Sequence, residues 1–209
     1  MSTKKIFLVF GLMLAIGLAG YTQNLRFGVT AGFDVAETHG TNRAVMGAVR
    51  TYAPMMAFNV NAYLGYRISE KFGISLEPGF IQKGSTVYEP SVGKFQMREN
   101  CFQMPVLLEC FLFDKLFVSV GPELSYLING YDVLRGEVYN NTDWYNNRLE
   151  LSGVIGVNYR ISDHVDIGLR YNHGITYTTQ ITLTDQDGNV VGASNEYNQY
   201  GQILVRYRM

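Results

Sequence analysis

Three histidines and two cysteines are the residues of this sequence whose side chains most readily bind metals or act in catalysis. His39, His164 and His173 fall in different segments of the chain. In the topology derived below they lie far apart, so no shared metal site is predicted. Cys101 and Cys110 are nine residues apart in one expected strand. At about 3.3 Å per residue that is too far for a disulfide, so both are expected to be unpaired.

His173 is considered as a catalytic base, because a histidine can activate a neighbouring serine for attack on an ester or amide. A base must lie within hydrogen-bond reach of its nucleophile. The residues two positions away on the same face are Tyr171 and Ile175, and neither is a serine. A lipid-modifying enzyme is therefore a distant alternative, and the chain is not predicted to be an enzyme.

The segment 185–189 reads Asp-Gln-Asp-Gly-Asn, which resembles part of a calcium loop. The glutamate that closes such a loop is missing. Asp187 and Gly188 instead predict a hairpin turn that extends the two flanking strands. No cofactor is predicted from this or any other motif.

The composition excludes several classes of protein. Among 209 residues, 17 basic and 18 acidic side chains leave no excess of positive charge for binding a nucleic-acid backbone.

At the N-terminus, Lys4 and Lys5 precede the apolar run Ile6–Ala19, which is short for a membrane-spanning helix. Residues 1–22 are predicted to be a signal peptide cleaved between Gly20 and Asn24, with a buried N-terminal helix as the alternative. Residues 23–209 are then one exported domain.

Alternation of apolar and polar residues with period two dominates that domain, which is the pattern of half-buried β-strands. Eight segments show it: 25–35, 56–68, 72–83, 101–110, 118–128, 148–160, 165–172 and 202–209. Long polar connections at 36–54, 84–99, 130–147 and 178–196 alternate with tight turns at 69–71, 113–115 and 162–164. This arrangement predicts an all-β fold, an eight-stranded antiparallel up-and-down transmembrane β-barrel with long extracellular loops and short periplasmic turns. Prolines within three of the strands, Pro78, Pro105 and Pro122, predict bulges in the wall.

Aromatic residues on the apolar faces sort by height, as expected for belts at the two membrane–water interfaces. The belt near the short turns is expected to contain Phe27, Tyr66, Phe72, Tyr159 and Tyr207. The belt near the long loops is expected to contain Phe33, Phe58, Phe80, Phe102, Tyr126, Tyr177 and Tyr197.

The polar faces carry charges at strand depth, which a hydrocarbon exterior would force into the lumen. Charges removed from bulk water must pair, so a structural charge network is predicted across the lumen. Its expected members are Arg26, Arg67, Glu77, Lys83, Glu109, Glu123, Glu150, Arg160, Asp166, Arg170, Arg206 and Arg208. Because an eight-stranded barrel is only wide enough for side chains to fill it, the lumen is expected to be a polar core.

In order along the domain, several short stretches carry a resemblance to a known family: Phe27–Gly32, Leu76–Gly84, Met104–Glu109, Gly121–Leu127 and Arg170–Ile175. Together they resemble the PorT-like outer-membrane β-barrel family of Gram-negative bacteria. The resemblance implies an outer-membrane barrel but no single activity. The member that names the family belongs to a protein-secretion and gliding apparatus.

These patterns predict a non-enzymatic outer-membrane protein with a structural or interaction role, expressed through its extracellular loops. The expected partners are outer-membrane lipids and lipopolysaccharide, a protein bound at the loops, and the barrel-assembly machinery. The last of these would recognise the final strand, whose outward residues are Ile203, Val205, Tyr207 and Met209. No nucleic-acid partner is expected. The alternatives are a small outer-membrane channel and a soluble periplasmic barrel that binds an apolar ligand.

Overall fold

The computed structural model of the chain describes residues 24–41, 50–184 and 190–209. The predicted signal peptide and the segment 185–189 lie outside the described residues. Within them the chain forms strands and one short 3-10 helix, η1 (Thr142–Trp144). No helix among these residues has the length and apolar character needed to cross a membrane. The strands are β1 (Leu25–Gly40), β2 (Thr51–Ala53), β3 (Met55–Arg67), β4 (Phe72–Leu76), β5 (Gly79–Glu89), β6 (Gly93–Phe111), β7 (Leu116–Leu134), β8 (Glu137–Asn140), β9 (Leu149–Arg160), β10 (Val165–Gly174), β11 (Thr179–Thr184) and β12 (Val190–Arg208).

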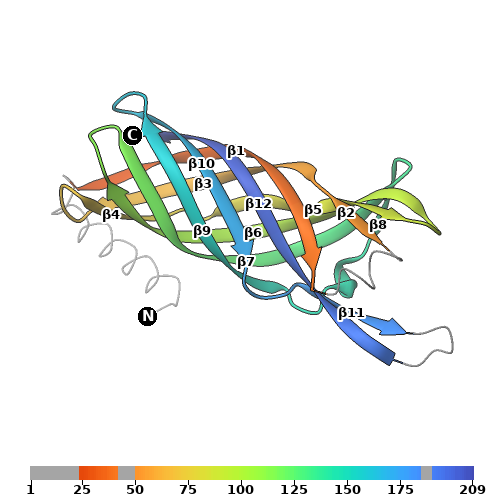
Figure 1. The fold of residues 1–209 in the computed structure, drawn as a ribbon. Coiled ribbons are helices and arrows are strands. Elements are labelled where there is room, and N and C mark those ends of the chain that lie inside the picture. Colours follow the sequence, from red (N-terminus) through yellow and green to blue (C-terminus); the bar gives the residue numbers. More distant parts are fainter. Residues whose placement is uncertain (1–23, 42–49, 185–189) are drawn as a thin grey trace, which may run out of the picture.

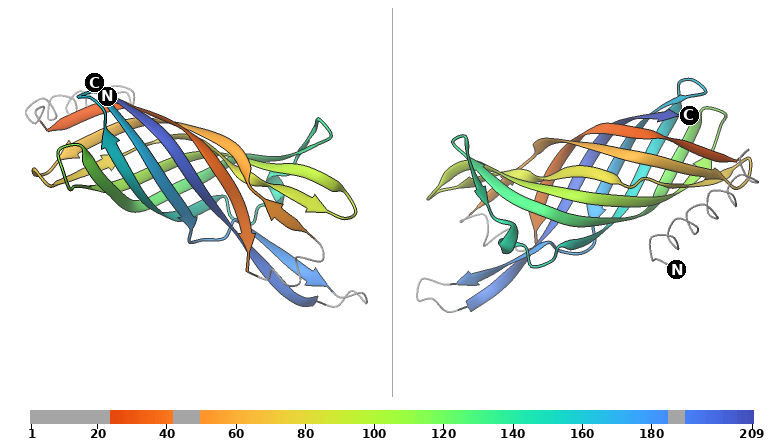
Figure 2. Two further views of the ribbon diagram at one scale, coloured as in Figure 1. Left: turned by 45° about the horizontal axis from the view of Figure 1, so that its top comes forward. Right: turned by 180° about the vertical axis from the view of Figure 1, so that it is seen from behind.

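The long strands close into an antiparallel barrel (Figures 1 and 2). Around the barrel the order is β1, β3, β4 with β5, β6, β7, β9, β10 and β12, and β12 pairs back with β1. We call these eight positions the wall strands, because β4 and β5 occupy one position in succession. Each wall strand pairs with the next one along the chain, which is the up-and-down topology. The predicted fold class is confirmed.

Alternation along each strand separates the two faces of the wall. Phe33 is 71% exposed, while its neighbour Asp34 is fully buried. The same contrast holds between Ile203, which is 66% exposed, and Leu204, which is 1% exposed. Apolar side chains therefore cover the outside of the barrel, and the inside is lined mainly by polar side chains, with some apolar ones such as Leu107 and Leu204 among them. This is the sidedness that a lipid exterior requires.

The two ends of the barrel differ. Turns at 68–71, 112–115 and 161–164 join strands at one end, which we call the turn end, and Met209 N–H donates to the carbonyl of Phe27 there at 2.8 Å. At the opposite end, the loop end, the strands continue far past the predicted boundaries, and β6, β7 and β12 each have 19 residues. The predicted loops 84–99, 130–147 and 178–196 are thus largely paired strands.

A change of surroundings explains why these extensions were predicted to be loops. Within the membrane most inward residues are polar, but at the loop end Val87, Phe95 and Met97 point inward and form an apolar cluster. Where the outward face meets water instead of lipid, apolar side chains are more stable on the inside of the barrel, away from water. The pattern that identifies the lower strands is therefore inverted in their upper parts.

The prediction of bulges at the prolines is wrong. The wall is interrupted between β4 and β5 at Pro78, but the register with both neighbours is the same before and after the break. Pro122 pairs with Gly153 in an unbroken register. The register shift between β6 and β7 lies at Asn100 and Cys101 instead.

Candidate functional site

The turn-end half of the lumen is held by a carboxylate that binds two arginines. Glu77, at the junction of β4 and β5, accepts a bidentate pair of hydrogen bonds from Arg170 of β10, both 2.7 Å. Its Oε1 also accepts a bond of 2.7 Å from Nη2 of Arg206 on β12. Arg206 Nη1 donates to Glu109 Oε1 of β6 at 2.9 Å. These four side chains are almost completely buried.

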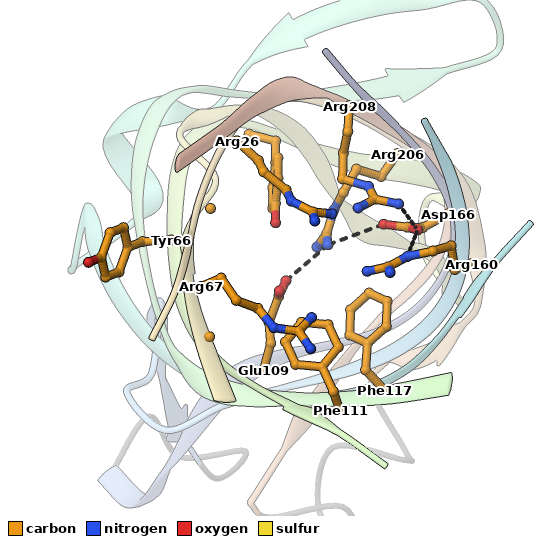
Figure 3. A pocket seen from close by; sticks show the side chains of 13 residues that line it. Arg26, Tyr66, Arg67, Glu109, Phe111, Phe117, Arg160, Asp166, Arg206 and Arg208 are labelled. Atoms are coloured by element: carbon orange, nitrogen blue, oxygen red, sulfur yellow. Dashed lines mark hydrogen bonds and ion pairs between the residues drawn. The ribbon is translucent and has the colours of Figure 1, made fainter. Parts of the chain in front are cut away.

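A second carboxylate lies beside this group. Asp166 of β10 accepts a hydrogen bond of 2.9 Å from Arg208 and lies 3.8 Å from Nε of Arg160. Its other oxygen is 3.7 Å from Arg206. Figure 3 shows these contacts from the turn end. Together with Arg26 and Arg67, the residues of these two paragraphs form the turn-end cluster.

Arg26 and Arg67 stand at the mouth of this cluster and make no ion pair with any described residue. Arg67 donates to the backbone carbonyls of Ser69 and Glu70. Its guanidinium carbon lies 3.5 Å from the centre of the Phe111 ring. Both arginines were predicted to join the network, and they are the two of the twelve predicted lumen residues that the structure leaves outside the ion pairs.

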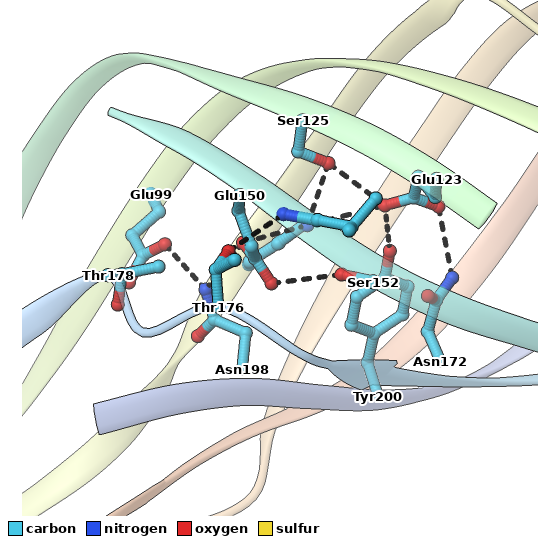
Figure 4. Close-up of polar contacts among 12 residues, drawn as sticks. Glu99, Glu123, Ser125, Glu150, Ser152, Asn172, Thr176, Thr178, Asn198 and Tyr200 are labelled. Atoms are coloured by element: carbon cyan, nitrogen blue, oxygen red, sulfur yellow. Dashed lines mark hydrogen bonds and ion pairs between the residues drawn. The ribbon is translucent and has the colours of Figure 1, made fainter. Parts of the chain in front are cut away.

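Further along the lumen a single lysine lies among acids, and we call this group the central cluster (Figure 4). Lys83 of β5 donates to Ser125 at 2.9 Å and to Glu150 at 3.2 Å, and lies 3.4 Å from Glu123. The side chain of Lys83 is fully buried. Because a buried ammonium group is costly without counter-charges, these carboxylates are needed at this position.

Neutral side chains complete the central cluster. Tyr200 donates its hydroxyl proton to Glu123 at 2.5 Å, and Asn172 donates to the same carboxylate at 3.0 Å. Asn198 of β12 donates to Glu99 of β6 at 2.9 Å. Glu99 and Asp34 are buried acids of this region that were missing from the predicted network. Glu99 was missed because it lies in the strand extension taken as the loop 84–99.

The contacts cross the whole width of the barrel. In the circular order of wall strands, β12 lies directly opposite β6, and β10 lies directly opposite the position of β4 and β5. Arg206 with Glu109, Arg170 with Glu77, and Asn198 with Glu99 therefore each join opposite walls. The lumen is crossed by direct side-chain contacts at more than one height.

The predicted aromatic residues lie on the outside of the wall. In the loop-side set, Phe33 pairs with Phe58, whose ring centre is 5.6 Å from that of Phe80. Phe102 pairs with both Phe80 and Tyr126, so the stripe crosses five wall strands. Tyr177 and Tyr197 belong to the same predicted set and are half-buried. The turn-side residues Phe27, Phe72, Tyr159 and Tyr207 are exposed, and Tyr66 is half-buried.

The expectation that the histidines lie far apart is wrong for two of them. His39 of β1 and His173 of β10 flank β12 on the outer face, and their ring centres are 5.3 Å apart. Tyr197 stacks on His39 from β12. Strand β12 brings together residues that are distant in sequence, and only the closure of the barrel reveals this. Among the described residues no group of three metal-binding side chains is formed, and Cys101 and Cys110 are free thiols, as predicted.

The loop end has polar contacts of its own. They lie beyond Tyr126, which belongs to the loop-side aromatic set. Arg50 Nη2 lies 2.9 Å from a Glu89 carboxylate oxygen, and Tyr52 donates its hydroxyl proton to Glu196. Burial raises the pKa of Asp132 to about 6. These contacts join β2 to β12, and the residue before β2 to β5, above the membrane level. We call this end of the barrel, made of the strand extensions beyond Tyr126 together with β2, β8 and β11, the crown.

Comparisons with known proteins agree with this architecture. Residues 21–180 match the family model described as outer membrane protein beta-barrel domain. No curated protein matches the chain. The solved structure of Neisserial surface protein A (NspA) has a TM-score of 0.54 at 18% identity, covering 88% of this chain and 97% of that one. Ail, the attachment invasion locus protein of Yersinia pestis, has a TM-score of 0.49 at 9% identity, covering 89% and 99%. OprG of Pseudomonas aeruginosa, an outer membrane protein, has a TM-score of 0.48 at 11% identity, covering 88% and 95%.

Proposed function

We propose, from the premise that this chain belongs to the outer membrane protein beta-barrel domain family, that it is a non-enzymatic binding protein of the outer membrane. In this proposal the barrel is a rigid stem that carries no solute, and the crown at the loop end contacts a partner outside the cell. Within the family we place it among the PorT-like members, on the sequence stretches that resemble them. We further propose that residues 1–22 direct export and that β12 is recognised by the barrel-assembly machinery.

The filled lumen is the observation that carries the proposal. Side chains bonded across opposite walls occupy the space through which a solute would pass. Their carboxylates and guanidinium groups are paired, so opening a path would require breaking buried ion pairs, at a cost of several kcal/mol for each. The filled lumen therefore favours a closed barrel over the alternative of a small channel. The buried charges of the two clusters also disfavour an apolar ligand in the lumen, which argues against a soluble carrier.

Exposed apolar side chains on the crown support a binding role. Trp144, Val138 and Tyr139, on and beside β8, are 64%, 65% and 49% exposed. They lie beyond the loop-side aromatic set, where no hydrocarbon covers them. Large exposed apolar residues in water mark interaction surfaces, and tryptophan and tyrosine are enriched among residues that contribute most to binding. The partner we propose is lipopolysaccharide or a protein at the cell surface.

Ion conductance tests whether the barrel is closed to solutes. We expect purified protein in a planar bilayer to give no stepwise conductance under voltage, because the crossing ion pairs leave no continuous water path. An open porin, reconstituted in the same way, serves as the positive control. Correct folding of the protein is checked by a shift in gel migration on boiling. Reproducible stepwise openings from correctly folded protein would contradict the proposal and support the channel.

A tryptophan substitution tests the crown. We expect Trp144→Ala to weaken binding to lipopolysaccharide-coated surfaces or to an identified surface protein by about tenfold or more, since buried tryptophans at interfaces contribute about 2 kcal/mol or more. Phe113→Ala is the matched control, because Phe113 is equally accessible at 71% exposure but lies at the turn end. Surface plasmon resonance with both variants in detergent measures the difference. Equal loss in both variants, or no loss in either, would argue against the crown as the binding surface.

A further inference from the structure

The turn-end cluster carries more positive than negative charge. Its lumen-facing bases are Arg26, Arg67, Arg160, Arg170, Arg206 and Arg208, and its acids are Glu77, Glu109 and Asp166. Each of the three turns beyond the cluster contributes one acid and one basic or histidine side chain, Glu70 with Lys71, Asp114 with Lys115, and Asp163 with His164. The turns therefore do not neutralise the excess. Six guanidinium groups face three carboxylates, and a cluster of this kind attracts anions.

The surplus donors line one hollow. Arg26, Arg67 and Arg160 reach into it from β1, β3 and β9 on different sides of the wall (Figure 3). Arg206 and Arg208 also line it, and both are at least nine-tenths buried. Among the described residues, the Nε–H groups of Arg160, Arg206 and Arg208 have no hydrogen-bond partner. A buried donor without a partner carries a desolvation penalty that a ligand oxygen would relieve.

The shape of the hollow limits the size of the ligand that it can bind. The bond between Arg206 and Glu109 closes it toward the lumen, and Phe111 and Phe117 form part of its lining. It is a small hollow, and it opens on the side of the short turns. A small ion, or the end group of a larger molecule, can enter from that side without passing through the barrel.

We propose that this hollow binds a phosphate dianion, either free or as the end group of a phosphomonoester. Guanidinium groups bind tetrahedral oxyanions through paired N–H donors, and several converging arginines favour a doubly charged oxyanion over chloride. The carboxylates of the cluster already accept bonds from Arg170, Arg206 and Arg208, whereas Arg26 and Arg67 have no carboxylate partner among the described residues. Arg67 donates from Nε and Nη2 to backbone carbonyls, which leaves its Nη1 to bind the anion together with Arg26. The site lies at the opposite end of the barrel from the crown. Binding there is therefore independent of the proposed function and is tested separately.

Phosphate titration tests the site directly. Wild-type protein in phosphate-free non-ionic detergent is titrated with inorganic phosphate at constant ionic strength, with binding followed by isothermal titration calorimetry. We expect saturable binding, and we expect the double variant Arg26→Gln/Arg67→Gln to weaken it by about tenfold or more, since two charge-assisted contacts are lost. Neither arginine pairs with a carboxylate of residues 24–41, 50–184 or 190–209, so this variant is expected to fold, which the gel shift on boiling checks. Arg148→Gln is the matched control, because Arg148 is exposed near the loop end, and it is expected to bind phosphate as the wild type does.

A second arm separates the two sources of phosphate. The wild type and the double variant are reconstituted into vesicles with and without phosphatidic acid, a lipid phosphomonoester, and their urea midpoints are compared. Binding of free phosphate that depends on Arg26 and Arg67 supports the site with a soluble guest. Stabilisation by phosphatidic acid alone, with the same dependence, supports it with a lipid guest. If neither phosphate source distinguishes the double variant from the wild type, the proposal is overturned.

Discussion

The Glu77→Gln variant is expected to lose about 3–5 kcal/mol of unfolding free energy, the range for removing one partner of a buried ion pair. Glu77 is fully buried and accepts three hydrogen bonds of 2.7 Å from Arg170 and Arg206. A glutamine cannot accept all three, because its amide nitrogen would face a guanidinium N–H. It also leaves Arg170 without an ion-pair partner among the described residues, while Arg206 keeps Glu109 and Asp166. The cluster has no spare carboxylate to replace the lost one.

Urea unfolding in lipid vesicles, followed by the loss of the β-sheet circular dichroism signal, measures this change. Glu70→Gln is the control, since it makes the same chemical change on an exposed turn residue and is expected to alter stability by less than about 0.5 kcal/mol. If both variants unfold at the wild-type urea concentration, Glu77 does not stabilise the barrel through its ion pairs.

The Lys83→Met variant is expected to be destabilised by a similar amount, about 3–5 kcal/mol, for the opposite reason. Lys83 is the one cation within 4 Å of the buried carboxylates of Glu123 and Glu150 among the described residues. Methionine fills much of the same volume, so the loss reports the charge and not a cavity. Without the lysine, two acids near each other are left in a lumen that water does not freely enter.

A double-mutant cycle shows whether this loss is electrostatic. Adding Glu150→Gln to Lys83→Met removes one of the stranded charges and is expected to restore about 1 kcal/mol or more, the usual range for coupling between contacting residues. Lys115→Met, on an exposed turn, provides the control for removing a lysine elsewhere. Strictly additive effects of the two central substitutions would show that Lys83 and Glu150 do not stabilise each other.

The sequence identifies the faces of the wall far better than it identifies the contacts between them. Alternation assigns Glu77, Lys83 and Arg206 to the inward side, because the lipid exterior selects apolar residues at every second position. Which inward residues meet depends on strand tilt and on the register around the whole barrel. The pairing of Arg206 with Glu109, and the omission of Arg26, could not be derived from spacing along one strand.

Errors in the predicted strand ends have a separate origin. Alternation is informative where one face meets lipid, and it loses that meaning where both faces meet water or other protein. Glu99 and the apolar cluster of Val87, Phe95 and Met97 lie in that region. Similarly, the meeting of His39 and His173 follows from closure of the sheet, which leaves no local trace in the sequence.

Closure of the barrel also affects the order in which the strands pair during folding. Seven of the eight wall pairings join strands that are consecutive in the chain, but the ladder from Gly28 with Arg208 to Gly40 with Glu196 joins its two ends. Closing so long a loop costs more entropy than forming any hairpin, so this ladder is the slow pairing. Strand β12 also supplies Arg206 and Arg208. Until it arrives, β1 keeps an open edge, and Glu77, Glu109 and Asp166 lack those two counter-charges. The arrival of β12 therefore pairs the open edge of β1 and adds the missing arginines to these acids at the same time.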